Sequence, residues 1–495
     1  MKDPPGRVRA GALRQGGRRR PPSERTVHGN VREAAAWVIE RTLSSRSPAA
    51  GFLESAKERC DPYDHGLLRE LVLGTLTWCR RIDHVIAQAA NRRFDQIENG
   101  LRAPLRLAVY QLLFLDRMPH HAIVHEAVEQ ARHATHRGGA SFANAVLRRV
   151  ARDARLDAWP VEERDPVRRI AVEHSHPDFL VRRWVEQFGE RRTRELLVAN
   201  NRPKPLQLLA FRHRGGRELL AEALIDEGVE VSASELAPLG LEVLSGQPLH
   251  SESFRRGGFY VQDTASQAVA LLPPPAPGER ILDLAAAPGG KSFSLIAFEP
   301  AVRLVAADAS LPRLGVLRAN LERLELEVPV LAMDAGSPAV AGVFDRVVCD
   351  LPCTGTGTLR KNPELKWRIS EAEVGRLARE AGRMLEGAAE LVVPGGLLAV
   401  ITCSLELEEN DAVVDRFLAA HPEFAPLALE GRLPPPLQRH VCAPGRWQVL
   451  PAGVHDGFTV HVLARGDRRP AMSGSRQADS SAVPPGRAAD AGGGE

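Results

Sequence analysis

The stretch ILDLAAAPGGKSFSL, residues 281–295, decides the fold class of this 495-residue chain. An apolar run ends at Asp283, small residues and two glycines follow, and a helical pattern then begins, which predicts a strand, a turn and a helix. Glycine lets a ligand approach the backbone closely, and the first N–H groups of a helix can bind it. The turn is neither the dinucleotide-binding G-x-G-x-x-G nor a Walker loop, which argues against NAD and ATP.

Further apolar runs alternate with helical patterns on the carboxyl-terminal side of this stretch. Such alternation predicts a Rossmann-like parallel sheet with helices on both faces, and we assign this domain to residues 256–466. FTVHVLAR, residues 458–465, is expected to add an edge strand. The other strand candidates are RLVAADAS (303–310), VPVLAMDAG (328–336), FDRVVCDLP (344–352) and GGLLAVITCS (395–404).

The rest of the chain divides by composition. Residues 28–155 carry apolar residues at helical spacing and predict an all-helical domain. Residues 160–255 mix helical and strand patterns with many arginines, which predicts a small α/β module whose arginines could contact RNA. The ends are low in complexity, so we expect 1–27 to be a disordered basic arm and 467–495 a disordered tail. The arm could bind phosphates or could simply be solvated charge.

Composition also bounds the setting of the protein. No apolar stretch is long enough to cross a bilayer, and the basic N-terminus lacks the apolar region of a signal peptide. Six cysteines without a framework spacing do not indicate disulfides, so we expect a reducing cytoplasm. The net charge of +3 is too small to identify a partner, and we expect a monomer without a metal.

Ligands of such sheets bind at the carboxyl ends of the strands. There Asp308 is placed to hold a ribose hydroxyl pair and Asp334 to accept from an adenine amino group. Taken alone, either residue is more often a helix cap or a turn residue. Together they outline an adenosine-shaped pocket.

Two thiols and a carboxylate follow neighbouring strands at the same edge. Asp350 and Cys353 end the fourth strand, Cys403 ends the fifth, and Lys291 closes the glycine turn. A lone cysteine is often a buried core residue, and a lysine at a helix start is often solvent-facing. No Cys-x-x-Cys pair or histidine set accompanies the thiols, which disfavours zinc.

Several of these stretches resemble one family. LDLAAAPGGK, VFDRVVCDLPCTGTGTLRKNPELKW and ITCSLELEEN resemble the signature motifs of the RsmB/NOP family of RNA cytosine-5 methyltransferases, and they occur in the family's order. YQLLFLDRMPHHAIVHEAVEQAR and FANAVLRR resemble a NusB-type RNA-binding helical domain, in which Arg132, His133, Arg148 and Arg149 could form a basic face. The resemblance implies a NusB-like domain, a linking module and a class I methyltransferase domain. Ala285 and Asn362 stand where the family often has Cys and His.

The resemblance also implies roles for the residues at the sheet edge. Cys403 matches the nucleophile that adds to cytosine C6, and Cys353 matches the thiol that assists product release. Asp350 is expected to bind the cytosine edge near the sulfonium, and Lys291 is a candidate catalytic residue at the same mouth. S-adenosylmethionine is the implied cofactor, and its expected site consists of Ala285, Ala286, Ala287, Pro288, Gly289, Gly290, Lys291, Asp308, Asp334 and Asp350.

The implied function is methylation of cytosine C5 in RNA, in particular 16S ribosomal RNA, through a covalent Cys–C6 adduct. Two alternatives stay open: a non-catalytic RNA-binding factor for ribosome assembly, and a cytosine-5 methyltransferase that acts on tRNA. A DNA cytosine-5 methyltransferase is disfavoured because the Glu-Asn-Val segment that would follow its Pro-Cys motif is not found.

Overall fold

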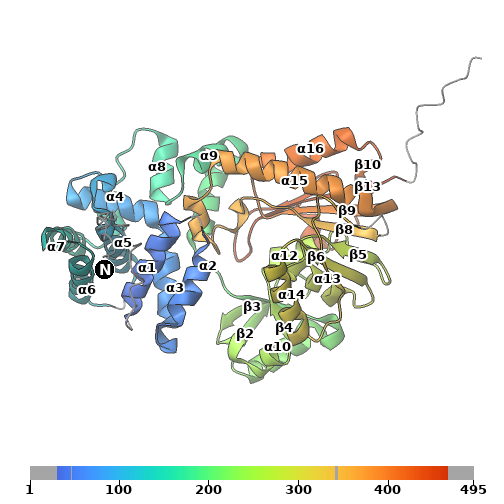
Figure 1. The fold of residues 1–495 in the computed structure, drawn as a ribbon, viewed down its shortest axis with the longest axis horizontal. Coiled ribbons are helices and arrows are strands. Elements are labelled where there is room, and N and C mark those ends of the chain that lie inside the picture. Colours follow the sequence, from blue (N-terminus) through green and yellow to red (C-terminus); the bar gives the residue numbers. More distant parts are fainter. Residues whose placement is uncertain (1–29, 46, 117, 136, 340–343, 467–495) are drawn as a thin grey trace, which may run out of the picture. The chain divides into compact units, whose positions relative to one another are not determined.

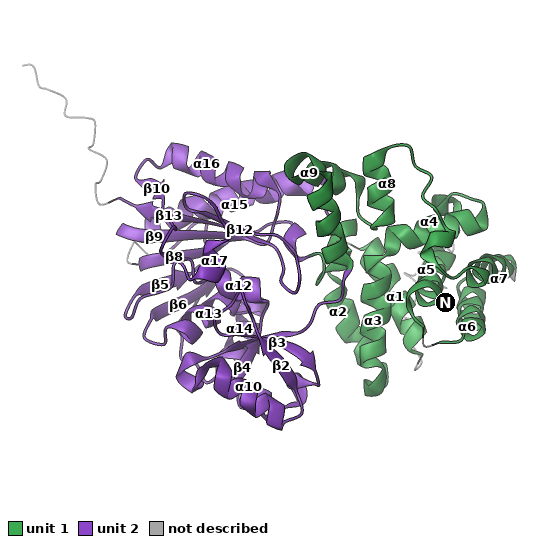
Figure 2. Cartoon of the chain, turned by 180° about the vertical axis from the view of Figure 1, so that it is seen from behind, with its two compact units in different colours: residues 1–201, 359–368 green, residues 202–358, 369–495 purple. Residues whose placement is uncertain are grey.

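The chain forms two compact units in the computed structural model (Figure 2). We call residues 1–201 with 359–368 the helical unit, and residues 202–358 with 369–495 the α/β unit. The predicted basic arm and tail lie outside the described residues. The described residues are 30–45, 47–116, 118–135, 137–339 and 344–466.

The helical unit buries the apolar faces of its helices in one core. Val38, Leu68, Leu105 and Leu147 come from four different helices and have no exposed surface. The sixth helix begins directly after Pro119, as the sequence predicts, and the ninth is kinked at Gly189, where φ is 77°. The helices are α1 (Val31–Ser44), α2 (Ala49–Lys57), α3 (His65–Thr77), α4 (Cys79–Ala90), α5 (Asn99–Phe114), α6 (His120–Ala134), α7 (Arg137–Arg152), α8 (Pro166–Glu173) and α9 (Asp178–Asn201), with short 3-10 helices η1 (Pro62–Asp64), η2 (Phe94–Gln96) and η3 (Leu156–Ala158).

A segment from far along the chain completes the helical unit. Residues 359–368 follow the fourth predicted strand of the parallel sheet in sequence, yet they belong to this unit. Within them lies the 3-10 helix η7 (Pro363–Trp367), whose Trp367 packs on the helical core and donates from Nε1 to Leu76 O at 2.7 Å. The α8 and α9 helices belong to this unit too, so the division between the units falls inside the stretch 160–255.

The α/β unit contains a small antiparallel sheet with the strand order β2-β3-β1-β4. Leu208 and Phe259 of this sheet are buried completely and form a core with Leu224 of the adjacent helix. The elements are β1 (Gln207–Ala210), η4 (Arg212–Arg214), α10 (Gly216–Asp226), β2 (Glu230–Ala233), β3 (Gly240–Ser245), η5 (Pro248–His250), α11 (Glu252–Arg255) and β4 (Phe259–Val261).

The large sheet has the order β11-β12-β13-β9-β8-β5-β6-β7, and β10 pairs with β13. Strands β9, β8, β5, β6 and β7 are parallel, so their carboxyl ends share one edge. The elements are α12 (Thr264–Val269), β5 (Arg280–Asp283), α13 (Gly290–Phe298), β6 (Arg303–Asp308), α14 (Leu311–Arg323), β7 (Val330–Ala332), β8 (Phe344–Asp350), η6 (Thr356–Thr358), α15 (Glu371–Leu391), β9 (Val392–Thr402), η8 (Leu407–Glu409), α16 (Asp411–Ala420), β10 (Phe424–Pro426), α17 (Pro435–Gln438), β11 (Val441–Ala443), β12 (Arg446–Val449) and β13 (Phe458–Arg465).

The prediction that 458–465 forms an edge strand is wrong. Strand β13 lies between β12 and β9 and is antiparallel to both. Val460 and Val462 are buried completely because the β11–β12 hairpin covers the side that would otherwise be open. The short, mixed run RWQV did not mark β12 as a strand, so nothing in the sequence placed a neighbour there.

Alternate residues of the central strands point to opposite faces of the large sheet. Val348 and Ile401 pack in the core formed with α12, α13 and α14. Val347 and Val400 pack in the core formed with α15 and α16 on the other face (Figure 1). The predicted arrangement of a mainly parallel sheet between two helical layers is therefore confirmed. Among the described helices, none combines the length and the hydropathy that a bilayer crossing requires.

Candidate active site

The two thiols lie together at the carboxyl ends of β8 and β9. The parallel register pairs Asp350 with Ile401, which brings the loops after both strands to one place. Cys353 Sγ and Cys403 Sγ are 3.5 Å apart, and both residues are half-buried. A backbone bond from Gly357 N to Cys403 O, 2.9 Å long, joins the loops a second time. The predicted convergence of two thiols is thus a feature of the structure.

Asp350 and Lys291 form an ion pair at this edge. Lys291 is the second residue of α13, and its Nζ donates to Asp350 Oδ2. The same ammonium lies 5.5 Å from the centre of the Phe458 ring. Burial alone would lower the pKa of Lys291, but the Asp350 carboxylate and the nearby Cys403 raise it above its usual value. Lys291 is therefore a charged group turned inward, not a solvent-facing lysine at a helix start.

The two sulfur atoms have different surroundings. The hydrogen bond with Cys403, together with burial, raises the pKa of Cys353 well above its usual value. Cys353 thus keeps its proton near neutral pH. The Lys291 ammonium interacts electrostatically with Cys403, and a nearby cation favours a thiolate. The geometry therefore provides one proton-holding thiol and one thiol beside a positive charge.

The turn after β5 is built from small residues around a left-handed glycine. Gly289 has φ of 119°, and a Cβ there would lie 2.1 Å from the ring of Phe293, so both conformation and packing require glycine. Asp283, at the end of β5, is buried and accepts from Ser292 Oγ at 2.7 Å. Burial raises the pKa of Asp283 to about 6. Asp283 thus ties the strand to the first turn of α13.

Asp308 and Asp334 have different surroundings. Asp308 is 3% exposed, and its carboxylate accepts from Ala287 N at 3.3 Å and from Ser310 N at 2.9 Å. It therefore lies against the turn after β5. Asp334 is an exposed residue in an ion pair with Arg383, 3.0 Å from Oδ2 to Nη1. The Arg383 side chain was not anticipated, because it comes from the middle of α15 and no local pattern links it to Asp334.

Sequence reasoning missed the residues that hold the two thiol loops. The sequence gives Glu409 no role, yet it is 0% exposed and accepts from Thr354 N and Oγ1. The neighbouring Asn410 is 3% exposed and donates to Ser404 O at 3.0 Å. An acidic pair followed by Asn reads as a solvated helix start, and only the buried position reveals another role.

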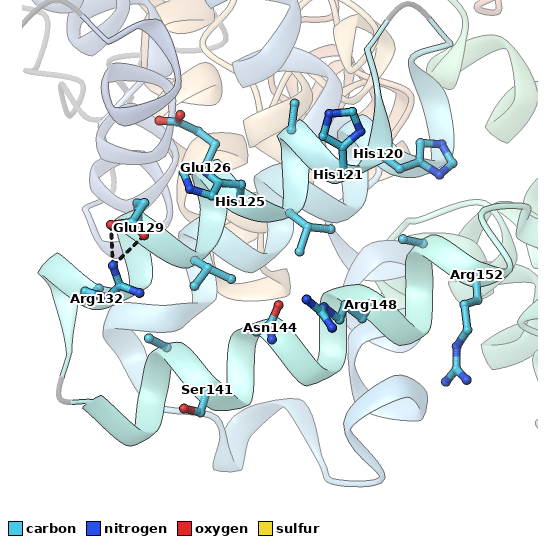
Figure 3. A pocket seen from close by; sticks show the side chains of 15 residues that line it. His120, His121, His125, Glu126, Glu129, Arg132, Ser141, Asn144, Arg148 and Arg152 are labelled. Carbon is cyan, nitrogen blue, oxygen red and sulfur yellow. Dashed lines mark hydrogen bonds and ion pairs between the residues drawn. The ribbon is translucent and has the colours of Figure 1, made fainter.

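A groove between α6 and α7 in the helical unit carries part of the expected basic face (Figure 3). Arg132 and Arg148 line it, whereas Arg149 donates to Ala89 O at 3.1 Å and lies over the Trp159 ring. His133 is exposed but is not part of the lining. The other polar residues of the groove are His120, His121, His125, Glu126, Glu129, Ser141, Asn144 and Arg152.

The part of the chain that the structure describes offers no evident metal site. Among the described residues, no group of three or more His, Cys, Asp or Glu side chains is arranged to hold a metal ion.

Family models match three successive parts of the chain. The model described as 16S rRNA methyltransferase RsmB/F matches residues 269–462, and the NusB family model matches residues 29–152. A model for the ferredoxin-like domain of RsmF/B-like methyltransferases matches residues 176–250. Together they cover most of the helical unit, three strands of the small sheet and nearly all of the large sheet.

Relatives align over most of the chain. A probable ribosomal RNA small subunit methyltransferase B of Bacillus subtilis is 33% identical over 85% of this chain and 95% of its own length. Ribosomal RNA small subunit methyltransferase B of Pseudomonas putida is 32% identical over 87% of this chain and 97% of its own. A solved structure titled "Crystal Structure of PH0851" covers 89% of this chain and 100% of its own, with 26% identity and a TM-score of 0.72.

Proposed function

Because the chain belongs to the RsmB/F family of 16S ribosomal RNA methyltransferases, we propose that it methylates C5 of a cytosine in 16S ribosomal RNA through a covalent Cys403–C6 bond. The observation that carries this proposal is the pair of thiols 3.5 Å apart beside the Lys291–Asp350 ion pair. One thiol has the surroundings of a nucleophile, and the other retains a proton. Covalent catalysis at C6 needs the first thiol for addition, and the second is placed to assist when the adduct breaks down.

Enzymes of this family take the methyl group from S-adenosylmethionine. The residues present fit this group, because the Asp308 carboxylate lies directly against a turn of small residues at the end of the central strand. We assign the ribose hydroxyls to Asp308 and the adenine amino group to Asp334. The remaining residues of the proposed site are Ala285, Ala286, Ala287, Pro288, Gly289, Gly290, Lys291 and Asp350.

Cytosine C5 is a weak nucleophile until C6 is saturated. The Cys403 thiolate adds to C6, and the electron pair of the C5–C6 double bond then becomes available at C5 to form the bond to the methyl group. Asp350 is placed to hydrogen-bond the cytosine edge and to stabilise the charge that develops in the ring. Lys291 keeps Asp350 in place and supplies the positive charge beside Cys403.

Release of the product reverses the addition. The C5 proton has to leave, and the bond from C6 to Cys403 Sγ has to break, so that the ring regains its double bond. Cys353 lies next to the sulfur that departs, 3.5 Å away. We assign to Cys353 the role of assisting this elimination: its thiol donates a proton to the departing Cys403 sulfur, and the Cys353 thiolate that results accepts the C5 proton, so both thiols are restored.

The helical unit is assigned to RNA binding. Arg148 and Arg152 of the groove between α6 and α7 are available to contact phosphates, since neither forms an ion pair within the described residues. The target base has to leave its stack to reach the half-buried Cys403 at the carboxyl end of β9. We therefore expect the target to be single-stranded RNA or a locally opened duplex.

The test is methylation by variants of the full-length protein. Bisulfite sequencing of 16S ribosomal RNA incubated with wild-type protein and S-adenosylmethionine is expected to show one protected cytosine. Cys403→Ala is expected to abolish that protection, with a loss of at least about 10⁴-fold in rate as for other covalent nucleophiles. A Cys403→Ala protein that methylates at the wild-type rate would sink the nucleophile assignment.

Cys353→Ala tests the second thiol. Because addition to C6 and methyl transfer do not need Cys353, this variant is expected to accumulate a protein–RNA adduct that survives a denaturing gel. The double variant Cys353→Ala/Cys403→Ala is the control, and it is expected to form no adduct. Absence of an adduct in the single variant would contradict the release role of Cys353 while leaving the role of Cys403 intact.

A further inference from the structure

Each thiol lies on a loop that has little regular structure of its own. Cys353 is followed by a Thr/Gly sequence before the one-turn helix η6, and Cys403 is followed by residues 404–406 before η8. Loops of this kind do not hold two sulfurs at 3.5 Å unless other groups fix them. The question is which side chains do so.

Glu409 joins the two loops next to one of the thiols. Its Oε1 accepts from Thr354 N at 2.9 Å, and its Oε2 accepts from Thr354 Oγ1 at 2.7 Å. Thr354 directly follows Cys353 in the chain, so both bonds act on the peptide unit that carries the thiol. The carboxyl group itself stands on η8, in the loop of Cys403.

The surroundings of Glu409 hold it in this position. Glu409 N donates to Glu406 O at 3.1 Å, and the neighbouring Asn410 donates to Glu406 O at 2.9 Å and to Ser404 O at 3.0 Å. The hydroxyl of Thr402 in turn donates to Asn410 Oδ1. The loop after Cys403 is therefore closed on itself before Glu409 reaches across to Thr354.

A second contact between the loops lies farther from the sulfurs. Leu405 N donates to Thr356 Oγ1 at 2.9 Å. Thr356 is three residues from Cys353, whereas Thr354 is its immediate neighbour. Thr356 Oγ1 also lies 3.3 Å from Ser404 Oγ. Of the side-chain contacts between the loops, the one made by Glu409 therefore acts most directly on the position of Cys353 Sγ.

We propose that Glu409 is a positioning residue that holds Cys353 beside Cys403 through its two hydrogen bonds to Thr354. The proposal deepens the proposed function, on which its catalytic consequence rests. The geometry of the bonds, and not the charge of the carboxylate, is what the reaction needs. In agreement with this, burial raises the pKa of Glu409 to about 7, so that the neutral form is already populated near neutral pH.

Two substitutions separate geometry from charge. Glu409→Gln keeps the length of the side chain and an oxygen for Thr354 N but carries no charge. Glu409→Asp keeps the charge and withdraws the oxygens by the length of one C–C bond. Glu408→Ala is the matched control, because Glu408 is the adjacent acidic residue and is exposed.

The first measurement uses neither RNA nor S-adenosylmethionine. Diamide converts two neighbouring thiols to a disulfide: each thiol loses a proton, and the two electrons released reduce the azo bond of diamide to a hydrazine. The rate at which the Cys353–Cys403 disulfide forms, followed by peptide mass spectrometry, therefore reports how close the sulfurs lie. We expect Glu409→Gln and Glu408→Ala to react within about threefold of wild type, and Glu409→Asp to react about tenfold more slowly.

The second measurement is methylation under single-turnover and steady-state conditions. Glu409→Asp is expected to lower the steady-state kcat about 100-fold, as a displacement of about 1 Å at a reacting group does, and to lower KM for RNA with it, because a step after adduct formation becomes rate-limiting. It is also expected to accumulate the covalent adduct, which a general loss of folding would not produce. Glu409→Gln is expected to retain kcat within about fivefold of wild type, which corresponds to about 1 kcal/mol.

Three outcomes would overturn the proposal. Equal disulfide rates in all four proteins would show that Glu409 does not set the distance between the sulfurs, even if wild type methylates RNA. A slow Glu409→Gln with a normal Glu409→Asp would show that the charge is required instead. A Glu409→Asp protein with wild-type kcat would exclude the positioning role. Failure of wild type to methylate any RNA would contradict the proposed function, while the diamide result would still decide the role of Glu409.

Discussion

After Cys353 the chain enters the helical unit at Leu359, whereas after Cys403 it stays within the α/β unit. Both segments contain a short 3-10 helix, η7 and η8, and each of these helices buries a residue that is normally charged. Lys366 is 1% exposed in the first segment, and Glu409 is 0% exposed in the second. The two segments can therefore be compared group by group.

One of the two buried groups donates hydrogen bonds, and the other accepts them. Lys366 Nζ donates to Asn201 Oδ1 at 2.6 Å and to Thr77 O at 3.2 Å, whereas Glu409 accepts from Thr354. Burial lowers the pKa of Lys366 well below its usual value and raises the pKa of Glu409 to about 7. In both places burial favours the neutral form.

The comparison teaches that the two thiol loops depend on different parts of the protein. The loop of Cys403 is closed by residues of its own unit. The loop of Cys353 continues, six residues later, into a segment whose side chains complete the core of the helical unit. Substitutions in η7 should therefore disturb the helical unit first, and substitutions in η8 should disturb the α/β unit first.

Removal of the Lys366 side chain is expected to have the largest effect on stability. Lys366→Ala leaves a cavity in the helical unit and leaves Asn201 Oδ1 and Thr77 O without their donor, which together cost about 4 kcal/mol. Hydrogen exchange resolved by peptide, measured on the full chain, is expected to accelerate in α3 and α9 but not in β5 and β8.

The control for this substitution is Lys361→Ala in the same segment. Lys361 is exposed, so its removal is expected to change the free energy of unfolding by less than about 0.5 kcal/mol. Faster exchange in β8 than in α3 after Lys366→Ala would contradict the assignment of the segment to the helical unit.

The Glu409 carboxyl is expected to make the stability of the α/β unit depend on pH. Its pKa is about 7 in the folded protein and about 4.3 in an unfolded chain, so the folded state binds more protons between these values. Stability from this group is complete below about pH 4.3 and is lost as the pH rises through about 7, a change of about 3.7 kcal/mol. The difference in unfolding free energy between wild type and Glu409→Gln, measured by urea titration at a series of pH values, is expected to fall over this interval. A pH-independent difference would mean that Glu409 has an ordinary pKa.

The parallel strands and the convergence of the two thiols can be predicted from the sequence, because both follow from local patterns. Alternating strands and helices predict parallel strands, and parallel strands place Asp350, Cys353 and Cys403 at one edge. The position of Lys291 beside Asp350 was an open question, because helical spacing does not tell whether a lysine at a helix start turns inward. Asp334 was expected at a nucleoside, and the structure adds its ion pair with Arg383, a contact between residues 49 apart in the chain.

The features that the sequence did not reveal depend on distant partners. The motif LRKNPELKW has the composition of a basic surface loop. In the structure, however, Lys366 donates a hydrogen bond to α9 and Trp367 donates one to α3, and both helices lie far away in the chain. Strand β13 reads as an edge strand until the β11–β12 hairpin is known. Glu409 and Asn410 have the sequence pattern of exposed polar residues, but both are buried, and hydrogen bonds satisfy their side chains. In each case a residue or strand is buried because a distant segment covers it or satisfies its polar groups, and such partners are not encoded locally.

Trp367→Phe is expected to have the smallest effect on stability. It tests the contribution of a single hydrogen bond between η7 and α3. Phe keeps most of the apolar contact of Trp367 with the helical core but removes the hydrogen bond from Nε1 to Leu76 O, which costs about 1 kcal/mol. Because Lys366 still holds η7, methylation is expected to stay within about twofold of wild type, which corresponds to less than about 0.5 kcal/mol. Peptide-resolved hydrogen exchange and single-turnover methylation of the same preparation measure both quantities. A loss of methylation larger than that of Lys366→Ala would show that Trp367, and not Lys366, determines how the helical unit holds the segment after Cys353.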